Sequence, residues 1–373
     1  MTQTAFGEIR AAVLREPNGP FEIEKLTIDR PGPNEVLVRI VAVGMCHTDL
    51  AVRARHLPTP LPAVLGHEGA GIVEAVGAGV QKVVPGDHVV LTFPSCGLCD
   101  SCLTGHPSQC FAAFPLYFGG ARLDGSHGLH CAHGPLHDRF FAQSSFATHS
   151  LATERNVVKV PKDAPLELLG PLACGIQTGA GAVLNSLRVR TGESFAVFGS
   201  GSVGLSAVMA ARLCGARHVI AVDVLPSRLE LARQLGATHA IDGREQDAFE
   251  EVRRITGAGV HHALDTTGRV EVIRGALNAL RPGGVCGVLG ASAPGSELPI
   301  DVNMFIGMSK TLRGIVEGDS VPDIFIPQLV ALHLQGAFPF DRLVRFYALD
   351  EINQAVQDSE AGRTIKPIIR MPA

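Results

Sequence analysis

The sequence lacks any uninterrupted run of about 18 apolar residues, so it offers no candidate for a membrane-spanning helix. It also lacks an excess of one charge, since 32 Lys and Arg residues against 36 Asp and Glu residues give a formal net charge of −4. The basic residues are dispersed, which argues against nucleic acid and against an anionic membrane surface as partners. The N-terminus has neither a basic start nor an apolar core, so we expect no signal peptide and a cytoplasmic protein.

Internal repeats and low-complexity tracts are missing as well, which argues against a repeat architecture. The 373 residues exceed what one domain usually holds, so two domains are expected. A hydrophobic content of 46% supports sizeable cores, and 42 glycines favour a turn-rich α/β protein. Nine cysteines in a long chain fit metal ligation in a reducing cytosol better than a disulfide framework.

The pattern of apolar runs and turn residues changes near residue 175. Before it, short β-like runs such as 35–40 and 87–91 are broken by Gly and Pro, which predicts a β-rich, partly antiparallel domain. After it, apolar strand-like runs alternate with helical patterns, which predicts a doubly wound parallel sheet. The runs are 195–198, 219–222, 263–265 and 285–289, with helices at 203–214 and 228–235.

The last segment of the chain resembles a return to the β-rich domain. We therefore assign residues 1–175 and 317–373 to that domain and residues 176–316 to the parallel-sheet domain. The fold class expected is α/β, with a second, β-rich catalytic domain.

Cys46 and His67, joined by the distant Cys174, form a candidate metal site. Two thiolates and one imidazole suit zinc, which is borderline-soft and has no redox chemistry of its own. Three protein ligands leave a fourth position open for water or substrate, as in a catalytic zinc site. The spacing is long, so this prediction depends on the other motifs in the chain.

A second zinc motif lies between residues 96 and 110. Four thiolates at C-x2-C-x2-C-x7-C spacing can close a tetrahedral shell, as in a structural zinc site. An iron–sulfur cluster is the alternative, but a ferredoxin run would place its fourth cysteine three residues after the third. The spacing therefore favours zinc, held by Cys96, Cys99, Cys102 and Cys110.

A glycine-rich turn, G-x-G-x-x-G, follows the strand at 195–198 and opens a helix. Such glycines permit close approach of the backbone to a pyrophosphate at the helix N-terminus. Asp223 follows nineteen residues after Gly204, where a carboxylate accepts ribose hydroxyls and repels a 2′-phosphate, which favours NAD over NADP. Arg228 either packs over the adenosine or is a solvated helix residue. The turn residues concerned are Gly199, Gly201, Val203 and Gly204.

With these motifs, the chain resembles the zinc-dependent medium-chain alcohol dehydrogenases over essentially its full length. The Cys2His donor set is the one found in that family. The matching stretches are 44–49, 66–71, 96–110, 174–179 and 199–204. Within the family, residues 140–148 and 314–319 are similar to the aryl (benzyl) alcohol dehydrogenase branch, which includes enzymes similar to geraniol dehydrogenase. The resemblance implies a GroES-like catalytic domain and a Rossmann domain.

The resemblance implies an activity as well: NAD-dependent, reversible oxidation of a primary aromatic or allylic alcohol to its aldehyde. Hydride would pass from a zinc-bound alkoxide to NAD, with two zinc ions per chain. Thr48 would take the alcohol proton, and Asp49 and Glu68 would support the metal ligands. His47 would lie beside the cofactor pyrophosphate, and Thr178 and Lys366 would also contact the cofactor.

One position departs from the family pattern. Many relatives have a histidine where this chain has Ala51, and there it ends the proton relay. The proton would leave through water or through His47. Thr92, Phe140 and Phe141 are expected to line an apolar substrate channel, although ordinary core packing is the alternative for the two phenylalanines. Five histidines offer a possible third metal site, although a solvated loop is favoured: His127, His130, His133, His137 and His149.

Two other functions compete with this one. A glutathione-dependent formaldehyde dehydrogenase would need basic residues at the pocket mouth, and no clear set is visible. A non-enzymatic zinc module is the alternative from another class, but the acidic balance and the complete second site argue against it. We expect a small-molecule alcohol or aldehyde as partner and a homodimer or homotetramer as the assembly.

Overall fold

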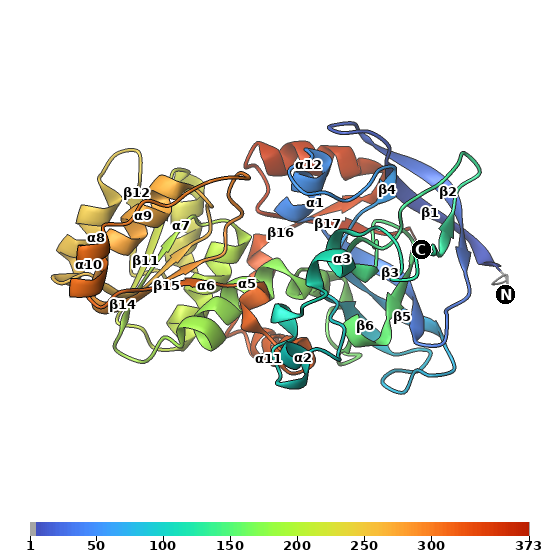
Figure 1. Ribbon diagram of the computed structural model, residues 1–373, viewed down its shortest axis with the longest axis horizontal. Helices are drawn as coiled ribbons and strands as arrows, with labels where there is room; N and C mark the ends of the chain where they lie inside the picture. The colour runs from blue at the N-terminus through green and yellow to red at the C-terminus, as the bar shows by residue number, and fades with distance from the viewer. Residues whose placement is uncertain (1–4, 373) are drawn as a thin grey trace. The chain divides into compact units, whose positions relative to one another are not determined.

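The computed structural model describes residues 5–372, which form two compact units (Figure 1). The first unit contains the described part of 1–174, together with 321–335 and the described part of 340–373. The second contains 175–320 and 336–339. The C-terminal segment joins the first unit through β17, which pairs antiparallel with β3. The two units correspond to the expected β-rich and parallel-sheet domains, but residues 175, 317–320 and 336–339, which the sequence placed in the first domain, belong to the second unit.

The first unit is built on two β-sheets. A four-stranded sheet has the order β4-β1-β2-β7, and a larger one has the order β16-β17-β3-β5-β6-β9, with β8 also paired to β3. Most neighbours are antiparallel, as the Gly- and Pro-broken runs predicted. The strands are β1 (Ala5–Leu14), β2 (Phe21–Asp29), β3 (Glu35–Gly44), β4 (Ala63–Val64), β5 (Glu68–Val76), β6 (His88–Leu91), β7 (Leu129–His130), β8 (His149–Thr153), β9 (Val157–Lys159), β16 (Val344–Ala348) and β17 (Lys366–Arg370).

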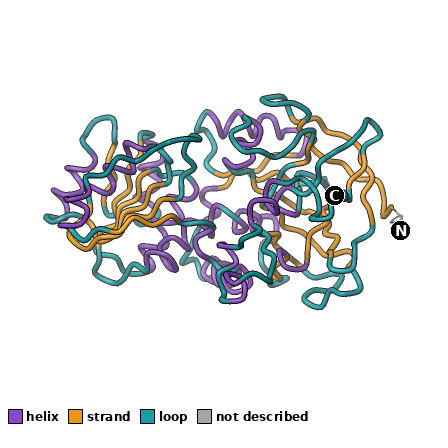
Figure 2. The backbone as a smooth tube through the Cα atoms, viewed as in Figure 1, coloured by secondary structure: helices purple, strands orange, loops and turns teal. Residues whose placement is uncertain are grey.

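The second unit contains a six-stranded parallel sheet in the order β12-β11-β10-β13-β14-β15. This is the order of a doubly wound dinucleotide-binding sheet. Helices lie on both of its faces (Figure 2). The central strands β10 and β11 are therefore buried on both sides and read as apolar runs, whereas the edge strand β15 is mostly exposed. The strands are β10 (Ser194–Phe198), β11 (His218–Asp223), β12 (His239–Asp242), β13 (Val260–Asp265), β14 (Leu280–Val288) and β15 (Thr311–Gly314).

The α-helices are mostly short. Helix α5 runs directly into a π-helical segment at 182–187. The helices are α1 (His47–Arg53), α2 (Asp100–Leu103), α3 (Ala113–Phe118), α4 (Leu166–Leu169), α5 (Gly175–Gly181), α6 (Ser202–Leu213), α7 (Pro226–Gln234), α8 (Ala248–Thr256), α9 (Val270–Asn278), α10 (Val302–Gly307), α11 (Pro322–Leu334) and α12 (Ile352–Glu360). Across residues 5–372, none of them has the length and hydrophobicity to cross a bilayer.

Candidate functional site

Four side chains of the first unit converge on one point. Cys46 lies between β3 and α1, His67 and Glu68 lie at the start of β5, and Cys174 follows a 3-10 turn at 170–173. One ligand atom from each residue lies within 4.8 Å of those of the others. Cys46 is half-buried and the other three are buried. The three predicted ligands are therefore brought together, with Glu68 beside them.

Asp49 connects two of these ligands from the first turn of α1. Its Oδ2 accepts the backbone N–H of Cys46 at 2.9 Å. Its Oδ1 lies 3.1 Å from His67 Nδ1 and accepts the backbone N–H of Gly66 at 3.1 Å. A proton on Nδ1, held by this carboxylate, leaves Nε2 with a lone pair. Nε2 is buried and has no hydrogen-bond partner among the described residues, which is what a metal-ligating nitrogen requires.

The electrostatics of this cluster favour a cation. A hydrogen bond from the Cys174 thiol, opposed by burial and helped by the charge of Lys366, holds the pKa of Cys46 well below its ordinary value. Burial lowers the pKa of His67, but the neighbouring Asp49 carboxylate raises it well above the ordinary value overall. A site that stabilises a thiolate and a positive charge side by side fits a divalent metal with Cys and His ligands.

Lys366 lies against this cluster, on β17. Its ammonium donates to Glu68 Oε1 at 2.7 Å and to the Met45 carbonyl at 3.2 Å. Lys366 is 1% exposed and Glu68 is fully buried. Burial lowers the pKa of Lys366, but the Glu68 carboxylate together with the thiols of Cys46 and Cys174 raises it overall. The family resemblance implies a place at the cofactor for Lys366 and does not predict this pairing with Glu68, because the two residues are far apart in the chain. Lysine is rarely buried unless it is paired.

The four-cysteine motif also closes on itself. The ligand atoms of Cys96, Cys99, Cys102 and Cys110 lie within 4.8 Å of one another. The backbone N–H groups of Leu98 and Cys99 donate to Cys96 Sγ, each at 3.4 Å, and lower the pKa of that thiol to about 6. Four sulfurs at this separation fit a closed, tetrahedral zinc shell.

The predicted relay residues lie on α1, next to Cys46. Thr48 Oγ1 is 3.8 Å from Cys46 Sγ and the side chain is half-buried, whereas His47 is exposed. Ala51 is buried at the end of the same turn. The hydroxyl is thus close to the ligand cluster, and the methyl group of Ala51 cannot carry a proton further.

Aromatic rings cover His67 on one side. Its imidazole stacks on the Phe141 ring, with centroids 4.6 Å apart, and meets Phe140 edge-on at 5.4 Å. Tyr117 of α3 stacks on Phe141 in turn, at 4.4 Å. Thr92 is fully buried and its hydroxyl donates to the Ala173 carbonyl at 2.9 Å, one residue before Cys174. Tyr117 was not among the predicted pocket residues, because nothing in its local pattern marks it.

The glycine-rich turn of the second unit has the geometry of a dinucleotide cradle. Gly199 has a φ of +94°, which favours glycine. A Cβ on Gly204 would lie 1.9 Å from the Gly199 carbonyl oxygen, so only glycine allows α6 to approach β10 this closely. Gly201 is the N-cap of α6, and a Cβ there would meet no atom within 4 Å. The open space at a helix N-terminus fits a phosphate group.

Asp223 ends β11 beside this turn. Its carboxylate accepts the backbone N–H of Ser200 at 2.6 Å and those of Val224 and Leu225 at 2.8 and 2.9 Å. Arg228 Nη1 lies 3.7 Å from the same carboxylate. Of the other predicted cofactor residues, Thr178 belongs to the second unit and donates to Glu317 at 3.3 Å, while His47 and Lys366 belong to the first.

The clustered histidines do not form a common site. His127, His130 and His149 each pair with a different carboxylate, those of Asp138, Asp29 and Glu74. Within residues 5–372, only the two cysteine-containing groups bring three or more such ligand atoms within 4.8 Å.

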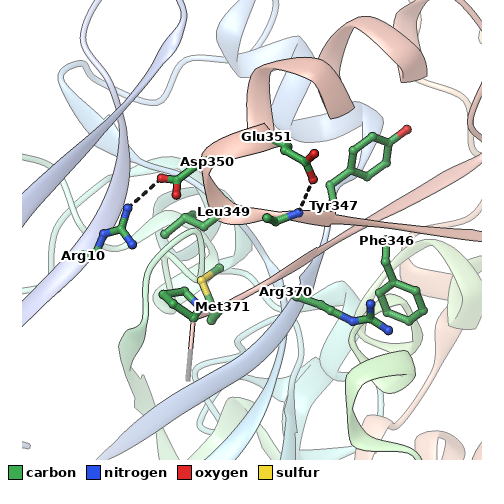
Figure 3. A pocket seen from close by; sticks show the side chains of 10 residues that line it. Arg10, Phe346, Tyr347, Leu349, Asp350, Glu351, Arg370 and Met371 are labelled. Atoms are coloured by element: carbon green, nitrogen blue, oxygen red, sulfur yellow. Dashed lines mark hydrogen bonds and ion pairs between the residues drawn. The ribbon is translucent and has the colours of Figure 1, made fainter.

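A separate pocket of about 320 Å³ lies over β16 and β17 (Figure 3). Arg10 pairs with Asp350 at 2.7 Å across it, and the Arg370 guanidinium lies 3.6 Å from the centroid of the Phe346 ring. Glu351 accepts the backbone N–H of Ala348 at 2.8 Å and Arg370 pairs with Glu167 at 2.9 Å, and no cysteine or histidine lines the pocket. It is therefore not a candidate for the reaction.

Comparison with known families supports this reading of both units. Residues 32–162 match the alcohol dehydrogenase GroES-like domain, and residues 202–332 match the zinc-binding dehydrogenase domain. Geraniol dehydrogenase from Castellaniella defragrans is 50% identical over 98% of each chain.

Two solved structures are similar over nearly the whole chain. An alcohol dehydrogenase zinc-binding domain protein from Burkholderia ambifaria is 60% identical with a TM-score of 0.97, covering 98% of this chain and 100% of that one. Benzyl alcohol dehydrogenase from Acinetobacter calcoaceticus is 51% identical with a TM-score of 0.96 at the same coverage. Identities and coverages of this size show that the chain belongs to the zinc-dependent medium-chain alcohol dehydrogenases.

Proposed function

We propose that this enzyme catalyses the NAD-dependent, reversible oxidation of a primary aromatic or allylic alcohol to its aldehyde. The observation that carries the proposal is the stack of Phe141 on the His67 imidazole, which places an aromatic surface against a metal ligand. Relatives at 50% and 51% identity are named for geraniol and benzyl alcohol, an allylic and an aromatic alcohol.

Cys46, His67 and Cys174 would hold one zinc ion, and the four cysteines of the second motif would hold another. When bound, the first zinc lowers the pKa of the alcohol and NAD accepts the hydride. Thr48 would accept the alcohol proton on its hydroxyl, and Asp49 would keep His67 in the tautomer that leaves Nε2 for the metal. In the absence of a histidine at position 51, the proton would leave through water or His47.

The preference for aromatic and allylic alcohols has an electronic and a packing component. The carbinol carbon becomes electron-poor as hydride leaves, and a neighbouring π-system stabilises that charge. A substrate ring that packs against the aromatic cluster of Phe140, Phe141 and Tyr117 would gain roughly 25 cal/mol per Å² of apolar surface removed from water. Ethanol has no π-system and little apolar surface, so it gains from neither.

Asp223 supports NAD over NADP. Its buried carboxylate stands at the end of β11, where a ribose 2′-phosphate would bring a second negative charge. Arg228 lies near this carboxylate and is already engaged by it.

Steady-state kinetics with benzyl alcohol, cinnamyl alcohol, geraniol and ethanol, each with NAD and NADP, tests the proposal. We expect kcat/KM with NAD to be at least about tenfold higher for the first three alcohols than for ethanol. Equal values for ethanol and benzyl alcohol would rule out the aromatic or allylic substrate class but leave the dehydrogenase activity standing.

Self-association is also proposed. Helix α10 exposes Val302, Met304 and Ile306 at 58–68%, directly before the edge strand β15. An exposed apolar helix beside an unpaired strand edge favours burial against a second copy. Sedimentation velocity of the wild type and of Ile306→Glu would test whether a dimer or tetramer depends on this surface.

A further inference from the structure

Phe140 and Phe141, the aromatic wall beside His67, belong to a turn with a strained backbone. Phe141, Ala142 and Ser144 all have φ values near +50°, in the left-handed region that side-chain-bearing residues rarely adopt. Three such residues within four positions keep this conformation only if contacts with the surrounding structure hold them in it. Backbone strain of this kind clusters at functional sites. The hydrogen bonds of the turn show which side chains do this.

Gln143, at the centre of the turn, is the side chain with the most connections. It is 1% exposed, and its Nε2 donates to the carbonyls of His67, Leu91 and Thr92 at 2.9, 3.1 and 3.3 Å. Its Oε1 accepts the backbone N–H of Gly69 at 3.2 Å and the Ser145 hydroxyl at 2.7 Å. One amide thus links the turn to the main chain of a metal ligand and to that of a predicted pocket residue.

Two further side chains hold the turn from other sides. Ser144 Oγ donates to the Val64 carbonyl at 2.6 Å and accepts the Phe140 N–H at 3.0 Å. Asn156 Nδ2 lies 3.5 Å from the carbonyls of Phe141 and Ala142, at the edge of hydrogen-bonding distance. These contacts fix the turn to the sheet, but neither reaches His67.

Gly69 makes the close approach of Gln143 possible. A Cβ at this position would lie 2.5 Å from Ser145 Oγ and 3.3 Å from Gln143 Oε1. The start of strand β5 therefore leaves room for the amide of Gln143 to make buried hydrogen bonds.

We propose that Gln143 is a positioning residue, which sets the Phe141 ring against His67 and thereby makes the site selective for aromatic over small aliphatic alcohols. This inference rests on the proposed function. The physical reason is that Gln143 bonds to the His67 main chain while Phe141, two residues earlier, stacks on the His67 ring. Loss of the amide releases the strained turn, so the wall moves, and a misplacement of about 1 Å can cost up to about 10²-fold in rate.

The test compares Gln143→Met, which keeps the volume and removes the hydrogen bonds, with the wild type. We expect kcat/KM for benzyl alcohol to fall by about tenfold or more, with a change of less than about threefold for ethanol. The affinity for benzamide in the presence of NADH, an unreactive mimic of benzaldehyde, should fall in parallel, while metal content stays at the wild-type value. Tyr347→Phe is the matched control, since it removes buried hydrogen bonds to Asp358 and Thr364 elsewhere in the same unit.

Each outcome decides the question. If the wild type prefers benzyl alcohol and Gln143→Met retains the wild-type ratio of kcat/KM values, the inference is overturned and the proposed function stands. A wild type with no preference would overturn the proposed function and this inference with it. If Gln143→Met is not recovered folded, Gln143→Asn withdraws the amide by one methylene group. A fall in the ratio of kcat/KM for benzyl alcohol to kcat/KM for ethanol in Gln143→Asn supports the inference, and an unchanged ratio overturns it.

Discussion

At the residue scale, the Thr48 hydroxyl is the proposed acceptor of the alcohol proton. Thr48 lies in the first turn of α1, with its Oγ1 3.8 Å from Cys46 Sγ. Position 51 is alanine, so its side chain cannot pass the proton on toward solvent. In the proposed reaction, this hydroxyl would accept the proton of the alcohol. The contribution of Thr48 should therefore be large and separable from metal binding.

We predict that Thr48→Ala lowers kcat by about 10²–10⁴-fold, the usual contribution of a positioned proton acceptor. Zinc content and NAD affinity should remain, because the metal ligands and the glycine-rich turn are untouched. Thr48→Ser keeps the hydroxyl and should retain most of the turnover. Near-normal kcat in Thr48→Ala at neutral pH would show that the proton passes directly to water.

The Asp223 carboxylate accepts backbone hydrogen bonds and is also proposed to select NAD over NADP. We predict that the wild type prefers NAD by about tenfold or more, since one repelled charge costs at least ~1.4 kcal/mol. Asp223→Gly should raise kcat/KM with NADP and lower it with NAD. Because Asp223 also accepts the Ser200 N–H at 2.6 Å, the variant should also lose thermal stability, and Asp223→Asn serves as the control that keeps an acceptor. Equal use of both cofactors by the wild type would refute this role.

At the scale of elements, the sequence predicted the four central strands of the parallel sheet, β10, β11, β13 and β14, because each contains a short apolar run. The edge strands β12 and β15 were not predicted, because neither is an apolar run. The sequence also predicted that the C-terminal segment rejoins the first unit, where β17 pairs with β3. The turn at 140–145 could not be predicted, since no glycine marks the left-handed residues Phe141, Ala142 and Ser144. No sequence pattern marks the bridging amide of Gln143 either, because its backbone partners come from two distant segments of the chain, 67–69 and 91–92.

The junction of β16, α12 and β17 has a pH-dependent component. Asp358 of α12 accepts the Tyr347 hydroxyl at 2.8 Å and Arg363 Nε at 2.8 Å. These hydrogen bonds, Tyr347 first, lower the pKa of Asp358 from 3.8 to about 2. A carboxyl group whose folded pKa lies below its unfolded pKa stabilises the fold above the unfolded value, and this contribution is lost as the pH falls through the folded one.

We therefore predict that Asp358→Asn lowers the melting temperature by a constant amount above about pH 4, and that the difference from the wild type shrinks toward pH 2. Thermal unfolding of both proteins in the same buffers gives this difference, in which the shared effect of metal release cancels. Asp163→Asn, at an exposed position, is the control for the change of charge. A difference that is independent of pH down to 2 would contradict the prediction.

At the scale of the whole molecule, the two candidate metal sites differ both in burial and in the number of cysteine ligands they offer. His67, Glu68 and Cys174 are buried, whereas three of the four cysteines in the second site are only half-buried. Burial alone would make the four-cysteine site the more accessible to a chelator. The number of thiolate ligands argues the other way, because four sulfurs close the shell and three protein ligands leave a position open. The two arguments give opposite orders of metal loss, so the order is informative.

We predict two zinc ions per chain, with the open site losing its metal first. Brief treatment with 1,10-phenanthroline should abolish activity and release about one zinc per chain while circular dichroism and the melting temperature change little. Longer treatment should remove the second zinc and then destabilise the protein, because a structural zinc contributes folding free energy. Added zinc should restore activity after the first stage, and Cys174→Ser should contain about one zinc and give no fast release. Three results would contradict this assignment of one catalytic and one structural zinc. They are iron in the purified protein, fewer than about two metals per chain in fully active enzyme, and loss of structure before loss of activity.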